Sequence, residues 1–400
     1  MNSGCGKCLW QSKVPDVNSK EILAQLISFD TTSHKSNLDL INFVADLLRS
    51  NKIEPVLIQD AEERKANLYA TTGPDDQGGV MLSGHTDVVP VEGQNWQKPP
   101  FKLTQEGGRL FGRGTADMKG FVACALDAMI KASSRALKSP LHLALSYDEE
   151  IGCVGVHSLI NTLDQAPIRP TMCIVGEPTN LAVATGHKGK TGLRAICKGV
   201  EGHSALAPMA YNAIHLGVDL TNILRTMQNE IEQTNLRDQD YDVPYTTVHV
   251  GKFNGGVALN IVPNHCELLF EIRNISADNP ATVLAQIESR IEEVLRTARL
   301  HSPDVDIRIE TFNSYPGLDT PTNAEVVAFV KSLTGANGTI KVAFGTEGGL
   351  FSQELGIPTV ICGPGSMAQG HKPDEFVEIE QIDRCDEMLG NLVKRLELGL

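Results

Sequence analysis

The stretch "LHLALSYDEEIG", Leu141–Gly152, joins an apolar run to three consecutive acids, Asp148, Glu149 and Glu150. The run of Leu and Ala has the composition of a buried strand. Adjacent carboxylates at the end of such a strand repel one another, so the arrangement needs a compensating positive charge. A bound cation would supply that charge. The stretch therefore predicts a buried strand whose carboxyl end carries a cation site.

The segments around this strand alternate between strand and helix patterns. "KANLYATTG" (65–73) and "GGVMLSGH" (78–85) have strand composition, whereas "LDLINFVADLLRSN" (38–51) and "KGFVACALDAMIKA" (119–132) place apolar residues at helical spacing. Strands that alternate with helices predict an α/β fold, with a largely parallel or mixed sheet covered on both faces.

The pattern changes near residue 185. From there the order strand, helix, strand, strand, helix resembles a ferredoxin-like α+β unit. The α/β pattern resumes from about Asp306, with "GIPTVICGPG" as a further strand. We therefore expect a discontinuous metal-binding domain at 18–184 and 306–400, an inserted domain at 185–305, and a flexible tail at 1–17.

Composition argues against several classes of partner. The chain of 400 residues carries a net charge of −14 and no basic cluster, so we expect no nucleic-acid partner. No apolar stretch reaches the roughly 18 residues that span a bilayer, and the N-terminus does not resemble a signal peptide, so we expect no membrane segment.

Nine scattered cysteines favour reduced thiols in the cytoplasm. Cys5 and Cys8 form a lone CxxC, which without a second pair does not predict a zinc site.

Acids and histidines recur at the ends of predicted strands or at the start of a helix. The segments are "SGHTDVVP", "GRGTADMKG", "DEEIG", "GEPTN" and "GPGSMAQGHKPDEF", which carry His85, Asp87, Asp117, Glu149, Glu150, Glu177 and His371. In an open α/β sheet, ligands bind beyond the carboxyl ends of the strands, so these loops can converge on one point. Each segment alone is more often a turn or a helix cap, and it is their joint occurrence that predicts a site.

The residue types at these positions indicate a metal site. Imidazole and carboxylate suit zinc, cobalt or manganese, and the absence of cysteine argues against a structural zinc site. With five candidate ligands, two ions that share Asp117 are favoured over one. Asp87 follows His85 by two residues and can accept a hydrogen bond from the imidazole nitrogen that does not hold the metal. Of the neighbours Glu149 and Glu150, one can bind metal while the other takes up a proton.

These motifs, in this order, resemble the M20 peptidases, a superfamily of metal-dependent aminoacylases and carboxypeptidases. The resemblance covers nearly the whole chain after about Lys20 and rests on "LSGHTDVVP", "GRGTADMKGF", "SYDEEIGCVG", "VGEPT" and "GTEGGLFSQELGIPTVICGPGSMAQGHKPDEF". It implies a zinc-peptidase-like α/β catalytic domain with an inserted lid that also forms a homodimer interface. The last motif is most similar to the acetylornithine deacetylase branch, with succinyl-diaminopimelate desuccinylases next.

The resemblance also implies a metal centre and a base. Glu149 would be the general base, and Asp87 would orient the first histidine. Two divalent ions, zinc or alternatively cobalt, would have as ligands His85 and Glu177, Glu150 and His371, and Asp117 between them.

Further residues are implied for the substrate. "GVEGHSALAP" makes His203 a candidate oxyanion stabiliser that reaches in from the partner subunit, and the segment "GGVALNIVPNHCELLFEIR" supplies Asn260 and Arg273, the latter for the α-carboxylate. Glu347 in "FGTEGG" stands where the desuccinylase pattern has an arginine close by. An acid without that cation fits a substrate that ends in an ammonium, such as ornithine.

We therefore expect an enzyme that deacetylates N2-acetyl-L-ornithine in arginine biosynthesis and whose partners are small-molecule N-acyl amino acids. A succinyl-diaminopimelate desuccinylase or a broader N-acyl-amino-acid hydrolase is the alternative within the same class. A non-catalytic binding protein of the same fold should have lost ligands or the base, and all of these residues are present.

Overall fold

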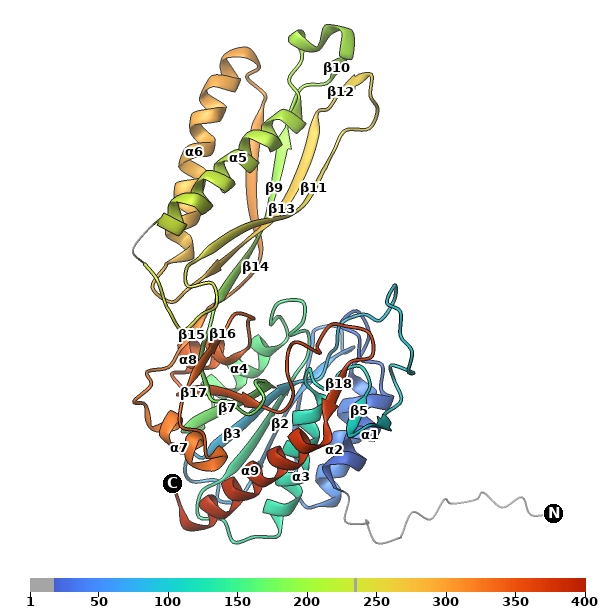
Figure 1. The fold of residues 1–400 in the computed structure, drawn as a ribbon, viewed down its shortest axis with the longest axis vertical. Coiled ribbons are helices and arrows are strands. Elements are labelled where there is room, and N and C mark those ends of the chain that lie inside the picture. The colour runs from blue at the N-terminus through green and yellow to red at the C-terminus, as the bar shows by residue number, and fades with distance from the viewer. Residues whose placement is uncertain (1–17, 234–235) are drawn as a thin grey trace, which may run out of the picture.

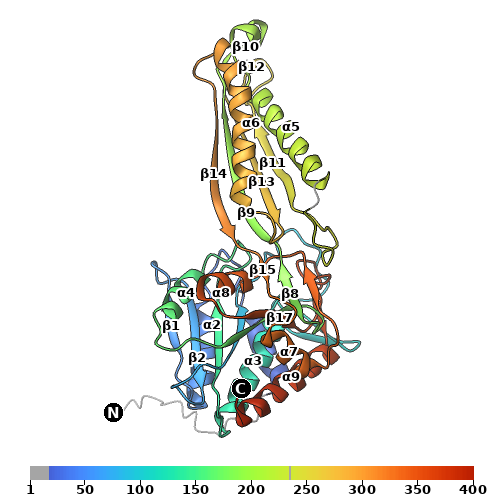
Figure 2. The ribbon, with the colours of Figure 1, turned by 90° about the vertical axis from the view of Figure 1, so that its left-hand side faces the viewer.

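The computed structural model describes residues 18–233 and 236–400. The expected tail at 1–17, with Cys5 and Cys8, lies outside these residues. The described chain forms two units stacked along the long axis of the molecule (Figure 1, Figure 2). The larger unit contains the first and the last described residues, and the middle of the chain forms the smaller one.

A mixed sheet of nine strands forms the centre of the larger unit. Its four central strands are mutually parallel, and antiparallel strands extend it on both sides. In spatial order the strands are β1 (Val56–Gln59), β2 (Ala66–Thr72), β6 (Leu141–Ser146), β3 (Val80–His85), β7 (Met172–Pro178), β17 (Thr359–Gly363), β8 (Ala184–His187) and β15 (Leu318–Asp319), and β16 (Ile340–Val342) pairs with β8.

Helices cover both faces of this sheet. Successive residues of a strand point to opposite faces, so Leu82 and Met81 of β3 belong to different cores. The core around Leu82 includes α1 (Ser19–Ser28), α2 (Leu38–Ser50), α3 (Lys119–Ser133), α7 (Glu325–Thr334) and α9 (Ile379–Leu398); the core around Met81 includes α4 (Val156–Asp164) and α8 (Gly348–Leu355). This layered arrangement confirms the predicted α/β class.

A small antiparallel sheet lies beside the helices of the larger unit. It has three strands, β4 (Thr104–Glu106), β5 (Arg109–Phe111) and β18 (Phe376–Glu378). Because β5 pairs with β18, the chain that enters α3 lies next to the segment that precedes β18. Two motifs separated by about 260 residues are thereby brought together.

The smaller unit has the strand and helix order of a ferredoxin-like fold. Its four-stranded antiparallel sheet has the order β11-β13-β9-β14, and α5 and α6 share one core with it. The elements are β9 (Gly189–Lys198), α5 (Ala213–Gln233), β11 (Thr247–Gly255), β13 (His265–Asn274), α6 (Pro280–His301) and β14 (Asp306–Tyr315). At the end remote from the larger unit, β10 (Gly202–His203) pairs with β12 (Ile261–Val262) beside the short helix η1 (Ser204–Met209) (Figure 1).

The limits of the smaller unit differ from the expected 185–305. Strand β8 continues the large sheet to His187, and β14 pairs with β9 instead of returning to the large sheet. The smaller unit therefore extends from Gly189 to Tyr315. The sequence of β14, "DIRIETFNSY", has a strand pattern, but such a pattern does not specify which sheet the strand joins.

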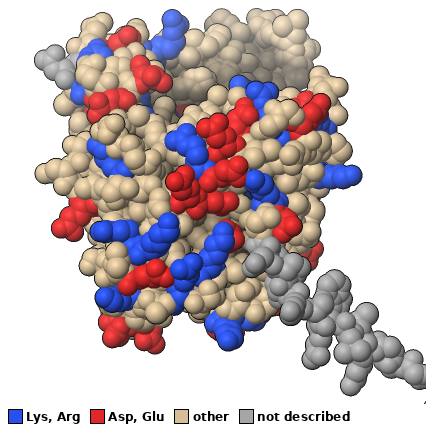
Figure 3. Space-filling model, turned by 60° about the horizontal axis from the view of Figure 1, so that its bottom comes forward, with Lys and Arg blue, Asp and Glu red and all other residues tan. Residues whose placement is uncertain are grey.

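Among the described helices, none combines the length and the apolar character needed to cross a bilayer. Figure 3 looks onto the face of the larger unit that is turned away from the smaller unit. Acidic and basic side chains are interspersed on this face, so neither sign of charge dominates it.

Candidate metal centre

The candidate ligands gather at the carboxyl edge of the parallel strands. His85 is the last residue of β3, Glu177 lies near the end of β7, and the acids at 148–150 follow β6. Asp117 lies in the loop that leads into α3, and His371 follows β17. As the strand pattern predicted, loops distant in the sequence converge on one point.

The Asp117 carboxylate lies between the two imidazoles. Its Oδ1 is 3.0 Å from His85 Nε2, and its Oδ2 is 3.1 Å from His371 Nε2. One oxygen thus faces each histidine, which is the arrangement needed for a carboxylate shared by two ions. Burial opposes ionisation of Asp117, but its bonds to His371 and His85 outweigh burial and lower its pKa.

The remaining candidate ligands flank these histidines. Glu150 Oε2 is 2.9 Å from His371 Nε2, and Glu177 Oε1 is 3.6 Å from His85 Nε2. Ligand atoms lie within 4.8 Å of one another in two groups: His85, Glu149 and Glu177, and His85, Asp117 and Glu150. The buried Glu150 Oε1 has no hydrogen-bond partner among the residues that the structure describes. Imidazole and carboxylate donors at this spacing, with one buried oxygen left free, fit a divalent ion.

The charges of the cluster also favour a cation. Burial, together with the charge of Asp117, raises the pKa of Glu150 to about 7. Burial raises the pKa values of Glu149 and Glu177 well above normal, and neighbouring carboxylates add to the effect. Hydrogen bonds to Asp117 and Glu150 raise the pKa of His371 to about 10. Dications would offset this repulsion between buried acids.

The three consecutive acids have three different surroundings. Asp148 forms an ion pair with Lys65 at 2.5 Å, away from the ligand cluster. Glu150 contacts His371, and Glu149 lines the cavity described below. Of these three acids, Glu149 and Glu150 therefore belong to the candidate ligand groups and Asp148 does not.

Asp87 supports the site differently from the expectation. The nearest acceptor to His85 Nδ1 is the backbone carbonyl of Asp87 at 2.9 Å, while the Asp87 carboxylate lies 3.5 Å away. That carboxylate accepts the backbone N–H groups of Glu149 at 3.1 Å and Glu150 at 3.3 Å, and the Ser33 hydroxyl at 2.7 Å. Asp87 therefore fixes the backbone of the two glutamates as well as the histidine ring.

A second buried carboxylate, which the sequence pattern did not indicate, fixes the loop that carries Asp117. Glu375 accepts the backbone N–H groups of Gly114, Ala116 and Asp117 at 2.9–3.1 Å. Arg113 donates to the same carboxylate at 2.7 Å, and both side chains are almost fully buried. Both residues occur in motifs already noted, "GRGTADMKG" and "GHKPDEF", but their pairing across the chain was not visible there.

A cavity of about 360 Å³ opens between the metal centre and the smaller unit. Asp117, Glu149, Glu150, Glu177 and His371 line it from the larger unit. From the smaller unit it is lined by Arg273 of β13, together with Lys190 and Tyr315. The structure thus brings Arg273, predicted from the resemblance, to the same cavity as the ligands.

His203 and Asn260 lie far from the cavity of their own chain. His203 belongs to β10 and pairs with Ile261 of β12, and the Asn260 carbonyl accepts the Ser204 N–H at 3.0 Å. Both residues are exposed at the end of the smaller unit remote from the large sheet (Figure 1). Neither lines the cavity of their own chain.

Glu347 lies beside the candidate metal centre, but its side chain is buried. It is 2% exposed and is not among the residues that line the cavity, so the structure does not support a contact between Glu347 and the ammonium of a substrate. It occupies the position before α8, beneath the strands that carry the metal centre. The position of Glu347 in a sequence motif does not show whether its side chain faces the cavity or is buried behind the strands.

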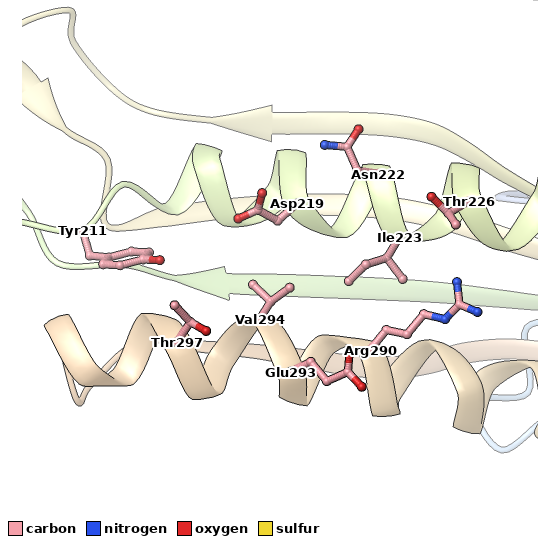
Figure 4. Close-up of a pocket in the computed structure, with 9 residues that line it drawn as sticks. All are labelled: Tyr211, Asp219, Asn222, Ile223, Thr226, Arg290, Glu293, Val294 and Thr297. Atoms are coloured by element: carbon pink, nitrogen blue, oxygen red, sulfur yellow. The ribbon is translucent and has the colours of Figure 1, made fainter.

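A larger cavity, of about 590 Å³, lies between α5 and α6 in the smaller unit (Figure 4). Asp219 and Glu293 line it together with Arg290 and neutral residues such as Tyr211. None of the predicted site residues lines this groove, and neither group of candidate metal ligands lies there.

Comparison with known sequences assigns the chain to a family. The sequence pattern of Peptidase family M20/M25/M40 matches residues 81–395. The protein belongs to the M20 peptidase family. It is a hydrolase that acts on amide bonds. An acetylornithine deacetylase of Pasteurella multocida (strain Pm70) is 34% identical over 380 residues, which are 93% of this chain and 94% of that protein.

Further relatives agree with this assignment. An acetylornithine deacetylase of Proteus mirabilis (strain HI4320) is 35% identical over 377 residues, 92% of this chain and 93% of that protein. The M20 family metallo-carboxypeptidase Sso-CP2 from Sulfolobus solfataricus has a TM-score of 0.76 at 18% identity, covering 95% of this chain and 99% of that one. The Bacillus subtilis YXEP protein, a dinuclear metal binding peptidase of the M20 family, has a TM-score of 0.68 at 13% identity, covering 96% and 98%. These two structures show that the fold is shared.

Proposed function

We propose that this M20 peptidase is an acetylornithine deacetylase, which hydrolyses N2-acetyl-L-ornithine to L-ornithine and acetate in arginine biosynthesis. The observation that carries the proposal is the 34% and 35% identity to acetylornithine deacetylases over more than nine-tenths of the chain. The clustered ligands and the cavity beside them support it.

The metal centre has a defined set of ligands in this proposal. His85 and Glu177 would hold one ion, Glu150 and His371 would hold the other, and Asp117 would be shared by both. When bound, zinc or alternatively cobalt would polarise the amide carbonyl and make a water molecule more acidic.

Glu149 acts as the general base and then as the general acid. It takes a proton from the attacking water and delivers it to the leaving amine. Its position on the cavity wall next to the ligands supports this role, as does the burial that raises its pKa. Arg273, on the opposite wall, binds the α-carboxylate of the substrate.

His203 and Asn260 complete the site from a partner subunit in this proposal. Their exposure at the remote end of the smaller unit leaves them free to enter another chain's cavity. The same end exposes apolar side chains, with Met209 at 78% and Val257 at 87%, as expected for a surface that another chain covers. Their role would be to stabilise the oxyanion and contact the substrate.

Mixing two inactive variants tests the contribution from the partner. Glu149→Ala and His203→Ala would each be inactive alone. A mixed dimer contains one site with an intact Glu149 and an intact His203 from different chains, so activity should return after subunit exchange. A mixture that stays inactive, although mixed dimers are detected, would contradict a contribution in trans.

A substrate panel tests the proposed activity. N2-acetyl-L-ornithine, N-acetyl-L-methionine and N-succinyl-diaminopimelate would be compared with added Zn²⁺ or Co²⁺ and with a chelator. The proposal expects N2-acetyl-L-ornithine to have the highest kcat/KM. Preference for the succinyl compound would indicate a desuccinylase, and equal turnover of the acetyl compounds a broader hydrolase. Absence of turnover with every metal would favour a binding protein of the same fold.

We also propose a cytoplasmic location. The seven cysteines among the described residues are free and buried, which suits a reducing compartment. Fractionation of the source cells with an antibody would test it, and recovery outside the cytoplasm would contradict it.

A further inference from the structure

Three side chains form a row across the sheet of the smaller unit. Lys190 of β9 pairs in register with Arg273 of β13 on one side and with Tyr315 of β14 on the other. Directly opposed residues of antiparallel strands point to the same face, with Cβ atoms about 4.5–5.5 Å apart. All three line the cavity, opposite Glu149 and Glu150. Two cations thus face the metal centre from neighbouring strands.

Arg273 is held in place by two hydrogen bonds. Its Nε donates to Glu271 at 3.1 Å, and its Nη1 donates to the Tyr315 hydroxyl at 3.1 Å. Nη2 has no hydrogen-bond partner among the described residues. The guanidinium is therefore oriented with one terminal nitrogen left for a ligand.

Lys190 is half-buried in the cavity wall, and its ammonium forms no ion pair with any residue that the structure describes. Because Lys190 and Arg273 are paired in register on adjacent strands, one anion can accept hydrogen bonds from both side chains. A carboxylate has two oxygens that can each accept one charge-assisted hydrogen bond. The pair therefore matches a single carboxylate better than a neutral or cationic group.

We propose that Lys190 is a second carboxylate-binding residue, which together with Arg273 grips the α-carboxylate of the substrate. This rests on the proposed function, because it assumes an N-acyl amino acid. Nη2 of Arg273 takes one carboxylate oxygen and Nζ of Lys190 takes the other. Both cations belong to the smaller unit, whereas Glu149 and Glu150 belong to the larger one. A carboxylate bound to the two cations would therefore orient the substrate's amide towards Glu149, on the opposite side of the cavity.

A role in charge balance would predict a different behaviour. If Lys190 only offset the negative charge of Glu149 and Glu150, its removal would affect every substrate alike. If it binds the α-carboxylate, its removal affects only substrates that carry this group. The substrate's own carboxylate can therefore serve as the second partner of a double-mutant cycle.

The experiment compares Lys190→Met with the wild type on N2-acetyl-L-ornithine and on its α-carboxamide, each with saturating Zn²⁺. N-acetyl-L-methionine and its α-carboxamide serve as a second pair. We expect Lys190→Met to raise KM for the acids by about 10-fold or more, because a charged hydrogen bond is lost, with kcat little changed. KM for the carboxamides should change by less than about 3-fold, and Lys190→Arg should restore most of the affinity for the acids.

Lys198→Met is the matched control, because Lys198 lies at the exposed, remote end of the same strand. It should leave both substrate pairs unchanged. If Lys190→Met changes KM equally for acids and carboxamides, or does not change KM for the acids, the assignment of Lys190 is wrong. The proposed function would not be affected by that result. If the wild type hydrolyses neither of the two acids, the proposed function is wrong, and the assignment of Lys190 is wrong with it.

Discussion

The carboxylate of Asp87 accepts the backbone N–H of Glu149 at 3.1 Å. This bond connects the end of β3 to the loop after β6 and fixes the residue proposed as the general base. The same carboxylate accepts the N–H of Glu150 and the Ser33 hydroxyl. One buried acid therefore positions the backbone of both a proposed ligand and the proposed base.

Removal of the Asp87 carboxylate should lower activity without abolishing the fold. Asp87→Ala leaves the Glu149 N–H without its acceptor and loosens the loop, so kcat/KM should fall by about 10–100-fold, as for residues that support metal ligands. Ser33→Ala removes only one donor to the same carboxylate and should change kcat/KM by much less. Equal losses in the two variants would contradict the positioning role of Asp87.

The buried pair of Arg113 and Glu375 should be important for stability. Arg113→Met leaves the Glu375 carboxylate buried with its charge unpaired, and loss of one partner of a buried pair costs about 3–5 kcal/mol. The exposed pair of Arg109 and Glu378, at 2.9 Å, is a matched control, and Arg109→Met should cost less than about 1 kcal/mol. Urea unfolding of both variants measures the difference. Similar free energies of unfolding would refute the importance of the buried pair.

His142 should make the protein less stable at acid pH. Burial lowers its pKa from 6.5 to about 4 in the folded state. Below pH 6.5 the unfolded chain therefore binds a proton that the folded protein does not, and stability is lost as the pH falls from 6.5 to 4. The loss amounts to roughly 3 kcal/mol for one histidine. His142→Gln should reduce the dependence of unfolding free energy on pH in this window, and an unchanged dependence would contradict a neutral buried histidine.

Glu149 should be needed for turnover and not for metal binding. In Glu149→Ala the five proposed ligands remain, so metal content and the far-UV circular dichroism spectrum should match the wild type. Loss of a general acid–base group should lower kcat by about 10²–10⁴-fold. Glu347→Gln serves as a comparison, because the side chain of Glu347 is buried and does not line the cavity. This substitution should leave KM for N2-acetyl-L-ornithine unchanged. Residual activity of Glu149→Ala near the wild-type level would place the base elsewhere.

The strand ends could be predicted from the sequence because local pattern determines them. An apolar run that ends in an acid or a histidine indicates the carboxyl end of a parallel strand, and His85 and Glu177, found in this way, do lie together. Pairing between distant segments could not be predicted in the same way. The position of β14 beside β9 depends on sheet partners, which the alternation of side chains does not specify.

The substrate side of the site was the least predictable part. Lys190 joins the cavity only through its register with Arg273, 83 positions away, and neither residue has a local signal for that contact. Glu347 was expected to favour a substrate that ends in an ammonium, because of its position in a motif, but its side chain is buried at the start of α8. The proposed preference for N2-acetyl-L-ornithine therefore rests on the similarity to acetylornithine deacetylases and not on an acid in the cavity.

In the proposed metal centre, the carboxylate of Asp117 would join two ion positions built from His85, Glu150, Glu177 and His371. Metal content measured by elemental analysis, after exhaustive chelation and reloading with Zn²⁺, tests it most directly. We expect two ions per chain in the wild type and one or none in Asp117→Ala, with the fold retained. Two ions per chain in Asp117→Ala, or a single ion in the wild type, would contradict it.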